Sequence, residues 1–311
     1  MDKNSFIFVA GHRGMVGSAI IRKLKDSGYV NIVTFDGDLT NQVEVDAFYR
    51  NYSIDFVFMA AAKVGGILAN KKHPVQFMQD NLYIQTNVIS SSHEYGVKKL
   101  LMLGSSCIYP RNCKQPIKEE YLLTGPLEPT NDAYAIAKIA GLKLCRYYQL
   151  EHRESFISAM PCNLYGPGDN FSLEGSHVIP AMIRKFHEAK VSGDKSVTLW
   201  GSGNPLREFL YVDDLADALV MLMDSYNDIE HINVGYGVDI SIGGLASFVS
   251  QVVGYTGDII WDSSKPDGTP RKLLDVSKMD KLGWKPETDL ITGLEKSYQW
   301  FLDNQNILRS K

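Results

Sequence analysis

The chain has 311 residues, 44% hydrophobic and 22% charged, and 32 lysines and arginines against 36 aspartates and glutamates leave a formal net charge of -4. This composition excludes a collagen, a coiled coil and an intrinsically disordered chain, each of which needs a far more biased composition. The near-neutral charge argues against a broad nucleic-acid-binding face. The length favours two domains, or one large fold with an embedded second lobe.

The first half of the chain alternates short β-rich runs with longer segments that have helical spacing. We predict strands at 5–10, 31–35, 56–60, 100–104 and 156–160, and helices at 16–27, 42–52, 75–95 and 132–151. Continuous apolar strands that alternate with amphipathic helices are typical of βαβ units around a parallel sheet buried on both faces.

After about residue 165, turns rich in glycine and proline divide the chain into shorter pieces, with further helices predicted at 179–190 and 213–226. We therefore predict an α/β fold, in which a Rossmann-type doubly wound parallel sheet is followed by a smaller, loop-rich C-terminal lobe. The dinucleotide-binding domain is expected at 1–165, with 208–238 returning to it. The substrate-binding domain is expected at 166–207 and 239–311, with a ligand cleft between the two.

The four cysteines are irregularly spaced and form no CxxC pair, so neither a secreted disulfide framework nor a zinc site is expected. The apolar run 6–10 is too short for the core of a signal peptide. The run 56–62 is far shorter than the roughly 20 residues of a membrane span. We expect a cytoplasmic protein in a reducing compartment, without metal, membrane or nucleic-acid partners.

A glycine-rich loop at 11–17 connects the first predicted strand directly to the first predicted helix. Its glycines allow a tight turn and a close approach to a pyrophosphate, and the following helix N-terminus offers free N–H groups. The loop therefore predicts a dinucleotide site, although its spacing is GxxGxxG rather than GxGxxG. Asp36, after the second strand, favours NAD, whereas Arg13 within the loop favours NADP, so the two signals conflict.

Tyr134 and Lys138 are four residues apart in a predicted helix, so their side chains lie on one face about one turn apart. An ammonium group there would lower the pKa of the phenol, which could then give a proton to a carbonyl oxygen as hydride reaches the carbon. Ser105 lies at the carboxyl end of the fourth strand, where ligand clefts open in doubly wound sheets. YxxxK alone is common on amphipathic helices, but together with Ser105 and the glycine loop it indicates a catalytic site.

These features resemble the extended short-chain dehydrogenase/reductase superfamily. Within it, the chain is similar nearly end to end to the GDP-L-fucose synthase family, through the motifs AGHRGMVG (10–17), AAAKVGG (60–66), LGSSCIYP (103–110), EPTN (128–131), YAIAKIAG (134–141), SHVIP (176–180) and PDGTPRKLLD (266–275). The resemblance implies NADPH-dependent 3,5-epimerisation and 4-keto reduction of GDP-4-keto-6-deoxy-D-mannose to GDP-L-fucose. It also implies a homodimer, formed through the helices at 75–95 and 132–151.

The resemblance implies roles for individual residues. From the residues alone, Cys107 is better explained as a small buried side chain and His177 as a residue at a helix start. The resemblance makes them the base and acid of the epimerisation, and both groups can titrate near neutral pH. Ser105, Tyr134 and Lys138 complete the catalytic set. The implied cofactor-binding residues are Gly11, His12, Arg13, Gly14, Met15, Val16, Gly17, Leu103, Gly104, Ser105, Ser106, Lys138, Pro161, Cys162, Asn163, Leu164 and His177.

Substrate binding is implied for Lys185, Trp200, Arg207 and Asp267. Arginine can form a fork on a diphosphate and tryptophan can stack on a flat ligand face. The resembled family usually has an arginine near the end of the second strand, where this chain has Phe35. The prediction of NADPH as the cofactor therefore rests on Arg13 and on the family resemblance, and use of NADH is an alternative.

Two other functions stay open from the sequence. A nucleotide-sugar 4-epimerase or 4,6-dehydratase would keep NAD tightly bound, and a dehydratase would also need an acid/base carboxylate pair, which is not evident in Ser105-Ser106-Cys107. A non-catalytic nucleotide sensor would be expected to have lost Ser105, Tyr134 or Lys138, and all three are present.

Overall fold

A six-stranded sheet forms the centre of the first lobe. The computed structural model describes residues 1–172, 175–265 and 267–307, and every strand pairing in this sheet is parallel. The strand order is β2 (Ile32–Val33), β1 (Ile7–Ala10), β3 (Phe56–Met59), β4 (Lys99–Leu103), β5 (Phe156–Pro161) and β9 (Ile232–Val234). β1 and β4 are buried throughout, as expected of strands covered on both faces.

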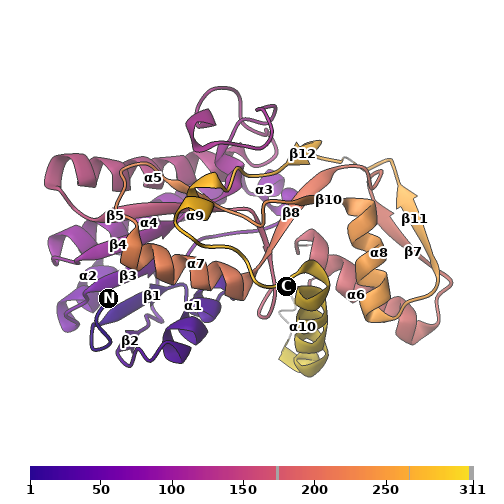
Figure 1. The fold of residues 1–311 in the computed structure, drawn as a ribbon, viewed down its shortest axis with the longest axis horizontal. Coiled ribbons are helices and arrows are strands. Elements are labelled where there is room, and N and C mark those ends of the chain that lie inside the picture. The colour runs from indigo at the N-terminus through magenta and orange to yellow at the C-terminus, as the bar shows by residue number, and fades with distance from the viewer. Residues whose placement is uncertain (173–174, 266, 308–311) are drawn as a thin grey trace.

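Helices cover both faces of this sheet (Figure 1). On one face α4 (Pro74–Glu94) packs against α5 (Asp132–His152) and α2 (Gln42–Asn51), and on the other α1 (Met15–Asp26) packs against α7 (Val212–Ser225). The short helix α3 (Ile67–Lys72) precedes α4, and α9 (Ser277–Lys281) lies beside β9. The predicted doubly wound α/β fold is confirmed.

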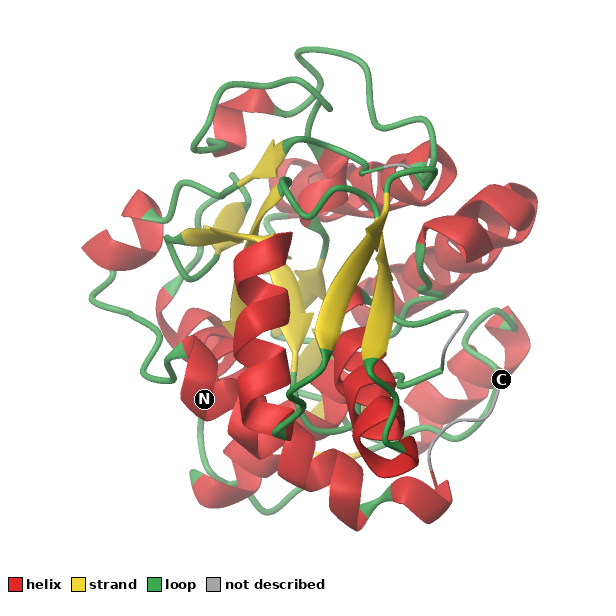
Figure 2. Cartoon of the chain, turned by 90° about the vertical axis from the view of Figure 1, so that its right-hand side faces the viewer, coloured by secondary structure: helices red, strands yellow, loops and turns green. Residues whose placement is uncertain are grey.

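The second lobe is built around two small sheets. One joins β6 (Asn163–Tyr165), β8 (Leu206–Tyr211), β10 (Asp239–Ser241) and β12 (Arg271–Lys272), and the other pairs β7 (Ser196–Trp200) with β11 (Asp258–Asp262). The β7–β11 pair faces the viewer in Figure 2. Helices α6 (Val178–Ser192), α8 (Ile242–Val253) and α10 (Leu290–Asp303) contribute to a second apolar core.

Helices α8 and α10 are additions to the predicted elements. The Gly243-Gly244 pair favours a break in the chain, but the Ser241 hydroxyl caps α8 by accepting a hydrogen bond from the Gly244 amide. Leu245, Ala246, Val249 and Val253 then recur at helical spacing and are buried in the second core. Tertiary packing therefore outweighs the low helix propensity of the glycine pair.

The sheet order creates a point where connections diverge. β1 lies between β2 and β3, so the connections that follow β1 and β3 leave towards opposite faces of the sheet. In open α/β sheets, ligands bind at the carboxyl ends of strands at such a switch point. The glycine loop follows β1, which places it there. β2 is shorter than predicted, so Phe35 and Asp36 lie beyond its end.

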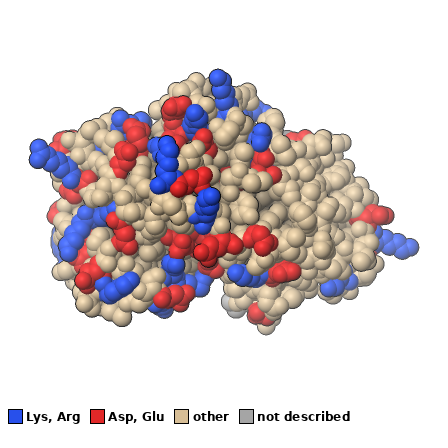
Figure 3. Space-filling view, in the orientation of Figure 1, with Lys and Arg blue, Asp and Glu red and all other residues tan. Residues whose placement is uncertain are grey.

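The outer surface carries mixed charge. On the face shown in Figure 3, lysine and arginine side chains are interspersed with aspartate and glutamate. The helices in the described part of the chain include none long and apolar enough to cross a membrane.

Candidate active site

A cavity of about 1040 Å³ lies at the carboxyl ends of β1, β3, β4 and β5 and extends to residues of the second lobe. It is lined by all of the predicted catalytic and cofactor-binding residues. Of the predicted substrate-binding residues, Lys185, Trp200 and Arg207 line it. Asp267 is not among the described residues that do so, although the neighbouring Gly268 is.

The glycine loop leaves no room for side chains. A Cβ on Gly17 would lie 2.2 Å from the Gly11 carbonyl oxygen, and Gly11 itself has a φ of +87° with its own Cβ position 2.7 Å from the Ala61 amide nitrogen. Gly14 is the N-cap of α1 and supplies no side chain to cap it, so first-turn N–H groups of α1 face the cavity that the loop lines. Helix N-terminal amides in a glycine-walled cradle fit a dinucleotide pyrophosphate.

Asp36 is held by the glycine loop. Its Oδ1 lies 3.1 Å from Nε2 of His12 and also pairs with the Arg13 guanidinium. The residues that gave conflicting cofactor signals in the sequence are therefore in direct contact.

Ser105 and Tyr134 share one side of the cavity with Lys138. Ser105 is the N-cap of a short 3₁₀ helix, Ser106–Ile108, and Tyr134 and Lys138 lie in the first two turns of α5. Lys138 is buried, its Nζ donates a hydrogen bond of 2.9 Å to the Leu103 carbonyl oxygen, and it lies 6.0 Å from the centroid of the Tyr134 ring. Burial lowers the pKa of Lys138 to about 8.

The expected lowering of the Tyr134 pKa is not what the structure shows. Burial of the phenol raises its pKa above the ordinary value, and the nearby Cys107 adds to the effect, while a hydrogen bond with Ser105 acts in the opposite direction. The desolvation of the phenol outweighs the hydrogen bond with Ser105. Tyr134 is therefore protonated at neutral pH and can donate a hydrogen bond, although the raised pKa makes the phenol a weaker acid than the sequence predicted.

Cys107 is surrounded by hydrogen-bond donors. Its Sγ lies 3.2 Å from Nδ2 of Asn131 and 3.7 Å from Nζ of Lys272, and its amide donates to the Ser105 hydroxyl. Burial acts to raise the pKa of the thiol, but the Lys272 charge and hydrogen bonds from Ser105, Lys272 and Asn131 together bring it below the ordinary value. Burial raises the pKa of the other three thiols, Cys113, Cys145 and Cys162.

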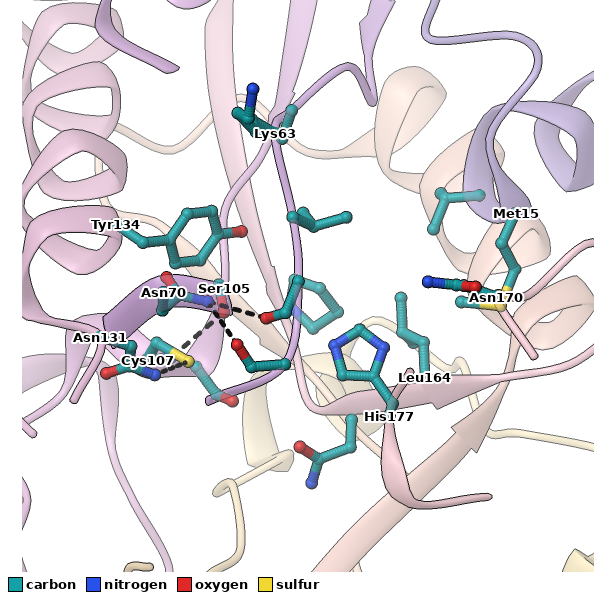
Figure 4. A pocket seen from close by; sticks show the side chains of 18 of the residues that line it. Met15, Lys63, Asn70, Ser105, Cys107, Asn131, Tyr134, Leu164, Asn170 and His177 are labelled. Carbon is teal, nitrogen blue, oxygen red and sulfur yellow. Dashed lines mark hydrogen bonds between the residues drawn. The ribbon is translucent and has the colours of Figure 1, made fainter. Parts of the chain in front are cut away.

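His177 lies across the cavity from Cys107. It is the exposed N-cap residue of α6, and Figure 4 shows its imidazole on the opposite side from Tyr134, Ser105 and Cys107. The structure therefore brings the five predicted catalytic residues to one cavity, with two titratable groups on opposite sides of it.

Three of the predicted substrate-binding residues, Lys185, Trp200 and Arg207, line a partly cationic part of the cavity. Trp200 is 52% exposed, and Nζ of Lys185 lies 5.8 Å from the centroid of its ring. Arg207 is half-buried, and its Nη1 donates to its own neighbour, the Leu206 carbonyl oxygen, at 2.8 Å. Both carboxylate oxygens of Asp267 accept hydrogen bonds from Ser202, at 2.7 and 2.8 Å. The neighbouring Pro266 of the PDGTPRKLLD motif lies outside the described residues.

Asn131, Lys272 and Lys63 also line the cavity, although the sequence did not single them out as site residues. Lys63 pairs with Asp80 at 2.9 Å. Asn131 and Lys272 contact the Cys107 sulfur. Lys272 is 165 residues from Cys107 along the chain. A contact between residues so far apart in the chain cannot be predicted from local sequence spacing.

Residues 7–235 match the NAD dependent epimerase/dehydratase family. The chain belongs to this family. Among curated relatives, GDP-L-fucose synthase 1 of Arabidopsis thaliana is 56% identical over 306 residues, which cover 97% of this chain and 95% of that protein. GDP-L-fucose synthase of Escherichia coli is 51% identical over 315 residues, covering 97% and 98%. The solved GDP-L-fucose synthetase from Naegleria fowleri bound to NADP superimposes with a TM-score of 0.91 at 30% identity, covering 100% of this chain and 98% of that one.

These relatives confirm the resemblance to GDP-L-fucose synthases predicted from the sequence motifs. The family match includes the glycine loop and all five predicted catalytic residues, whereas Lys272 lies beyond it. The chain is thus an enzyme of the epimerase/dehydratase family with a full set of candidate catalytic groups.

Proposed function

We propose that this enzyme converts GDP-4-keto-6-deoxy-D-mannose to GDP-L-fucose by 3,5-epimerisation followed by NADPH-dependent reduction of the 4-keto group. One observation carries the proposal: a single cavity holds a Ser105–Tyr134–Lys138 set together with Cys107 and His177 on opposite sides. The names of its full-length relatives support the same reaction.

Epimerisation beside a ketone needs a base, a stabilised enolate and an acid on the opposite side. The Cys107 thiolate removes the proton from C3 or C5, and the C–H electron pair moves to the C4 oxygen as an enolate. Hydrogen bonds from Ser105 and Tyr134 stabilise that oxygen. His177 then returns a proton to the carbon from the other face. The separation of Cys107 and His177 across the cavity suits inversion.

Reduction uses the same oxygen. The reduced nicotinamide supplies hydride to C4 when it is bound. Tyr134, whose pKa is raised by burial, gives its proton to the C4 oxygen. Lys138 would then stabilise the tyrosinate and bind the nicotinamide ribose, and its ammonium form prevails below about pH 8 because burial lowers its pKa to about 8. The same donors serve both steps because each passes through negative charge on one oxygen.

The two lobes would bind different ligands. Residues 1–165, with 208–238, would hold the cofactor, and residues 166–207 and 239–311 would hold the sugar nucleotide. Arg207 and Lys185 would face the GDP diphosphate, Trp200 would stack on a flat face of the ligand, and Asp267 would accept from the base or ribose if Ser202 releases it. Arg13 supports NADPH as the cofactor, whereas its ion pair with Asp36 leaves NADH as a second donor.

The working protein would be a cytoplasmic homodimer. Helices α4 and α5 expose several large apolar side chains, namely Val75, Tyr83, Ile136, Tyr147 and Leu150, which a partner's equivalent helices would cover. Because the reaction needs Cys107 as a thiolate, a reducing compartment suits the enzyme.

Incubation of the purified protein with the keto-sugar and NADPH in heavy water tests the function. We expect one equivalent of NADPH to be oxidised and deuterium to appear at C3 and C5 of the product. Cys107→Ser should suppress the deuterium uptake by roughly 10²-fold or more, and Tyr134→Phe should suppress NADPH oxidation similarly. NADPH oxidation without deuterium at either carbon would instead identify a simple C4 reductase. If neither occurs, the proposed function is wrong.

A further inference from the structure

We propose that Lys272 is a positioning residue that holds Cys107 as a thiolate and aims its sulfur into the cavity. The inference rests on the proposed function, in which this sulfur is the epimerisation base. Sγ of Cys107 lies 3.7 Å from Nζ of Lys272 and 3.2 Å from Nδ2 of Asn131. Lys272 comes from the second lobe and the cysteine from the first, so the contact joins the two lobes beside the cavity.

The hydrogen bonds around the sulfur are those of an anion. The ammonium group of Lys272 and the Nδ2 amide nitrogen of Asn131 can only donate hydrogen bonds to the sulfur. Asn131 is the N-cap residue of α5, yet its side chain makes no capping hydrogen bond and turns its amide to the sulfur instead. A neutral thiol is a weak hydrogen-bond acceptor and would gain little from several donors. A thiolate would form strong, charge-assisted hydrogen bonds with them.

The charge of Lys272 is available to the sulfur. No carboxylate within the described residues pairs with Lys272, unlike Lys63, which pairs with Asp80 at 2.9 Å. The other ionisable groups around Cys107 are Tyr134 on α5, Arg207 on β8, Glu128 just before α5, and His177 across the cavity on α6. Tyr134 is neutral because its pKa is raised, so the formal charges that remain are the positive ones of Lys272 and Arg207 and the negative one of Glu128, which pairs with Arg111 at 3.1 Å.

The backbone of Lys272 is fixed on both sides. Lys272 lies opposite Arg207 in the parallel β12–β8 pair. The preceding Arg271 pairs with Asp239 at 2.5 Å, and the following Leu273 amide donates to Oε1 of Gln115 at 2.8 Å. These contacts hold the lysine beside the sulfur without any need for substrate.

In the proposed reaction, Lys272 keeps the Cys107 sulfur free of a proton before substrate binds. The substrate C–H proton moves to Sγ and its electron pair moves to the C4 oxygen, while Lys272 keeps its own proton throughout. Without the lysine, burial would leave a neutral thiol that first has to lose its proton. Lys272 therefore sets the pH above which Cys107 can act as a base.

Alkylation of Cys107 with iodoacetamide as a function of pH, followed by mass spectrometry of its peptide, tests this directly. We expect Lys272→Met to raise the midpoint of the rate by roughly 1–3 pH units, the usual effect of losing an adjacent opposite charge. Lys272→Arg should restore most of the shift. Lys272→Gln provides a second neutral variant should the methionine impair folding, and Lys114→Met, at an exposed lysine, is the matched control.

Deuterium uptake at C3 and C5 provides the second measurement. At neutral pH, Lys272→Met should slow uptake by about tenfold or more and recover as the pH rises through its new alkylation midpoint. A purely structural or substrate-binding role would slow uptake or raise KM without moving the midpoint, and an unchanged alkylation midpoint overturns the proposal. A shifted midpoint in a protein whose wild type exchanges no deuterium would refute the proposed function and leave the assignment of Lys272 intact.

Discussion

Asp36 and Arg13 show how single residues set the chemistry at one end of the cavity. A carboxylate after the second strand accepts hydrogen bonds from the ribose hydroxyls of NAD, and an arginine there accommodates the phosphate of NADP. This chain has both groups, and they form an ion pair with each other. The 2′-phosphate of NADP would have to draw Arg13 away from Asp36 and would be repelled by the carboxylate. The ribose hydroxyls of NAD are uncharged, so they are not repelled and do not need Arg13.

We predict that Asp36→Asn tightens NADPH binding by about tenfold and weakens NADH binding, because it removes the repulsion of the 2′-phosphate and one ion pair of Arg13. Arg13→Leu should have the opposite effect on the ratio of the two dissociation constants. Titration of each variant with both dinucleotides, followed by nicotinamide fluorescence, measures this ratio, and Asp26→Asn, an exposed carboxylate outside the cavity, serves as control. An unchanged ratio in Asp36→Asn would show that the ion pair does not set the preference.

At the scale of the elements, the turn between β1 and α1 depends on close backbone packing. The Gly17 Cα faces the Gly11 carbonyl so closely that an added Cβ would lie 2.2 Å from its oxygen. Because the atom it would meet is backbone, relief requires a shift of the loop or of α1. Helix α5 positions its side chains by a different rule, since Tyr134 and Lys138 share a face through the helix period alone.

Gly17→Ala should therefore lower dinucleotide affinity by tenfold or more and reduce the free energy of unfolding by roughly 1–3 kcal/mol, as overpacking does. Titration calorimetry and urea unfolding measure the two effects. Lys25→Ala, at an exposed position in the last turn of the same helix, should change neither appreciably. Wild-type affinity in Gly17→Ala would mean that the loop can move without cost to binding.

At the scale of the whole molecule, two apolar cores carry separate parts of one cavity. β8 links them, because Leu210 packs in the first core and Phe209 in the second. The cavity is therefore complete only when the lobes are placed correctly. The face formed by α4 and α5 lies outside both cores and exposes apolar side chains, which supports the proposed homodimer.

Tyr147→Glu combined with Tyr83→Glu should convert the dimer to a monomer, because four charges would be placed in the apolar interface of two subunits. Size-exclusion chromatography with light scattering gives the mass. Val191→Glu, at an exposed valine on α6, is the control for adding charge to an apolar surface position. A wild type of monomer mass, or a double variant of dimer mass, would contradict the proposed interface.

The sequence by itself determined the features that follow from local geometry. Strand and helix alternation predicted the doubly wound sheet, the position of the glycines predicted the loop between β1 and α1, and the four-residue spacing of Tyr134 and Lys138 predicted their shared helix face. Each depends on the backbone periods of helices and strands, which neighbouring residues impose on one another. Helix α8 was not predicted from the sequence, because its glycine pair has a low helix propensity and the helix is stabilised by packing in the second core.

Only the tertiary structure decided the electrostatics of the site. It brought Lys272 to Cys107 from 165 residues away, paired Arg13 with Asp36, and engaged Asp267 with Ser202. It also reversed the expected pKa shift of Tyr134, because burial depends on every segment that surrounds the phenol. Distances between remote residues and exclusion of water are properties of the packed chain, so spacing along the sequence carries no measure of them.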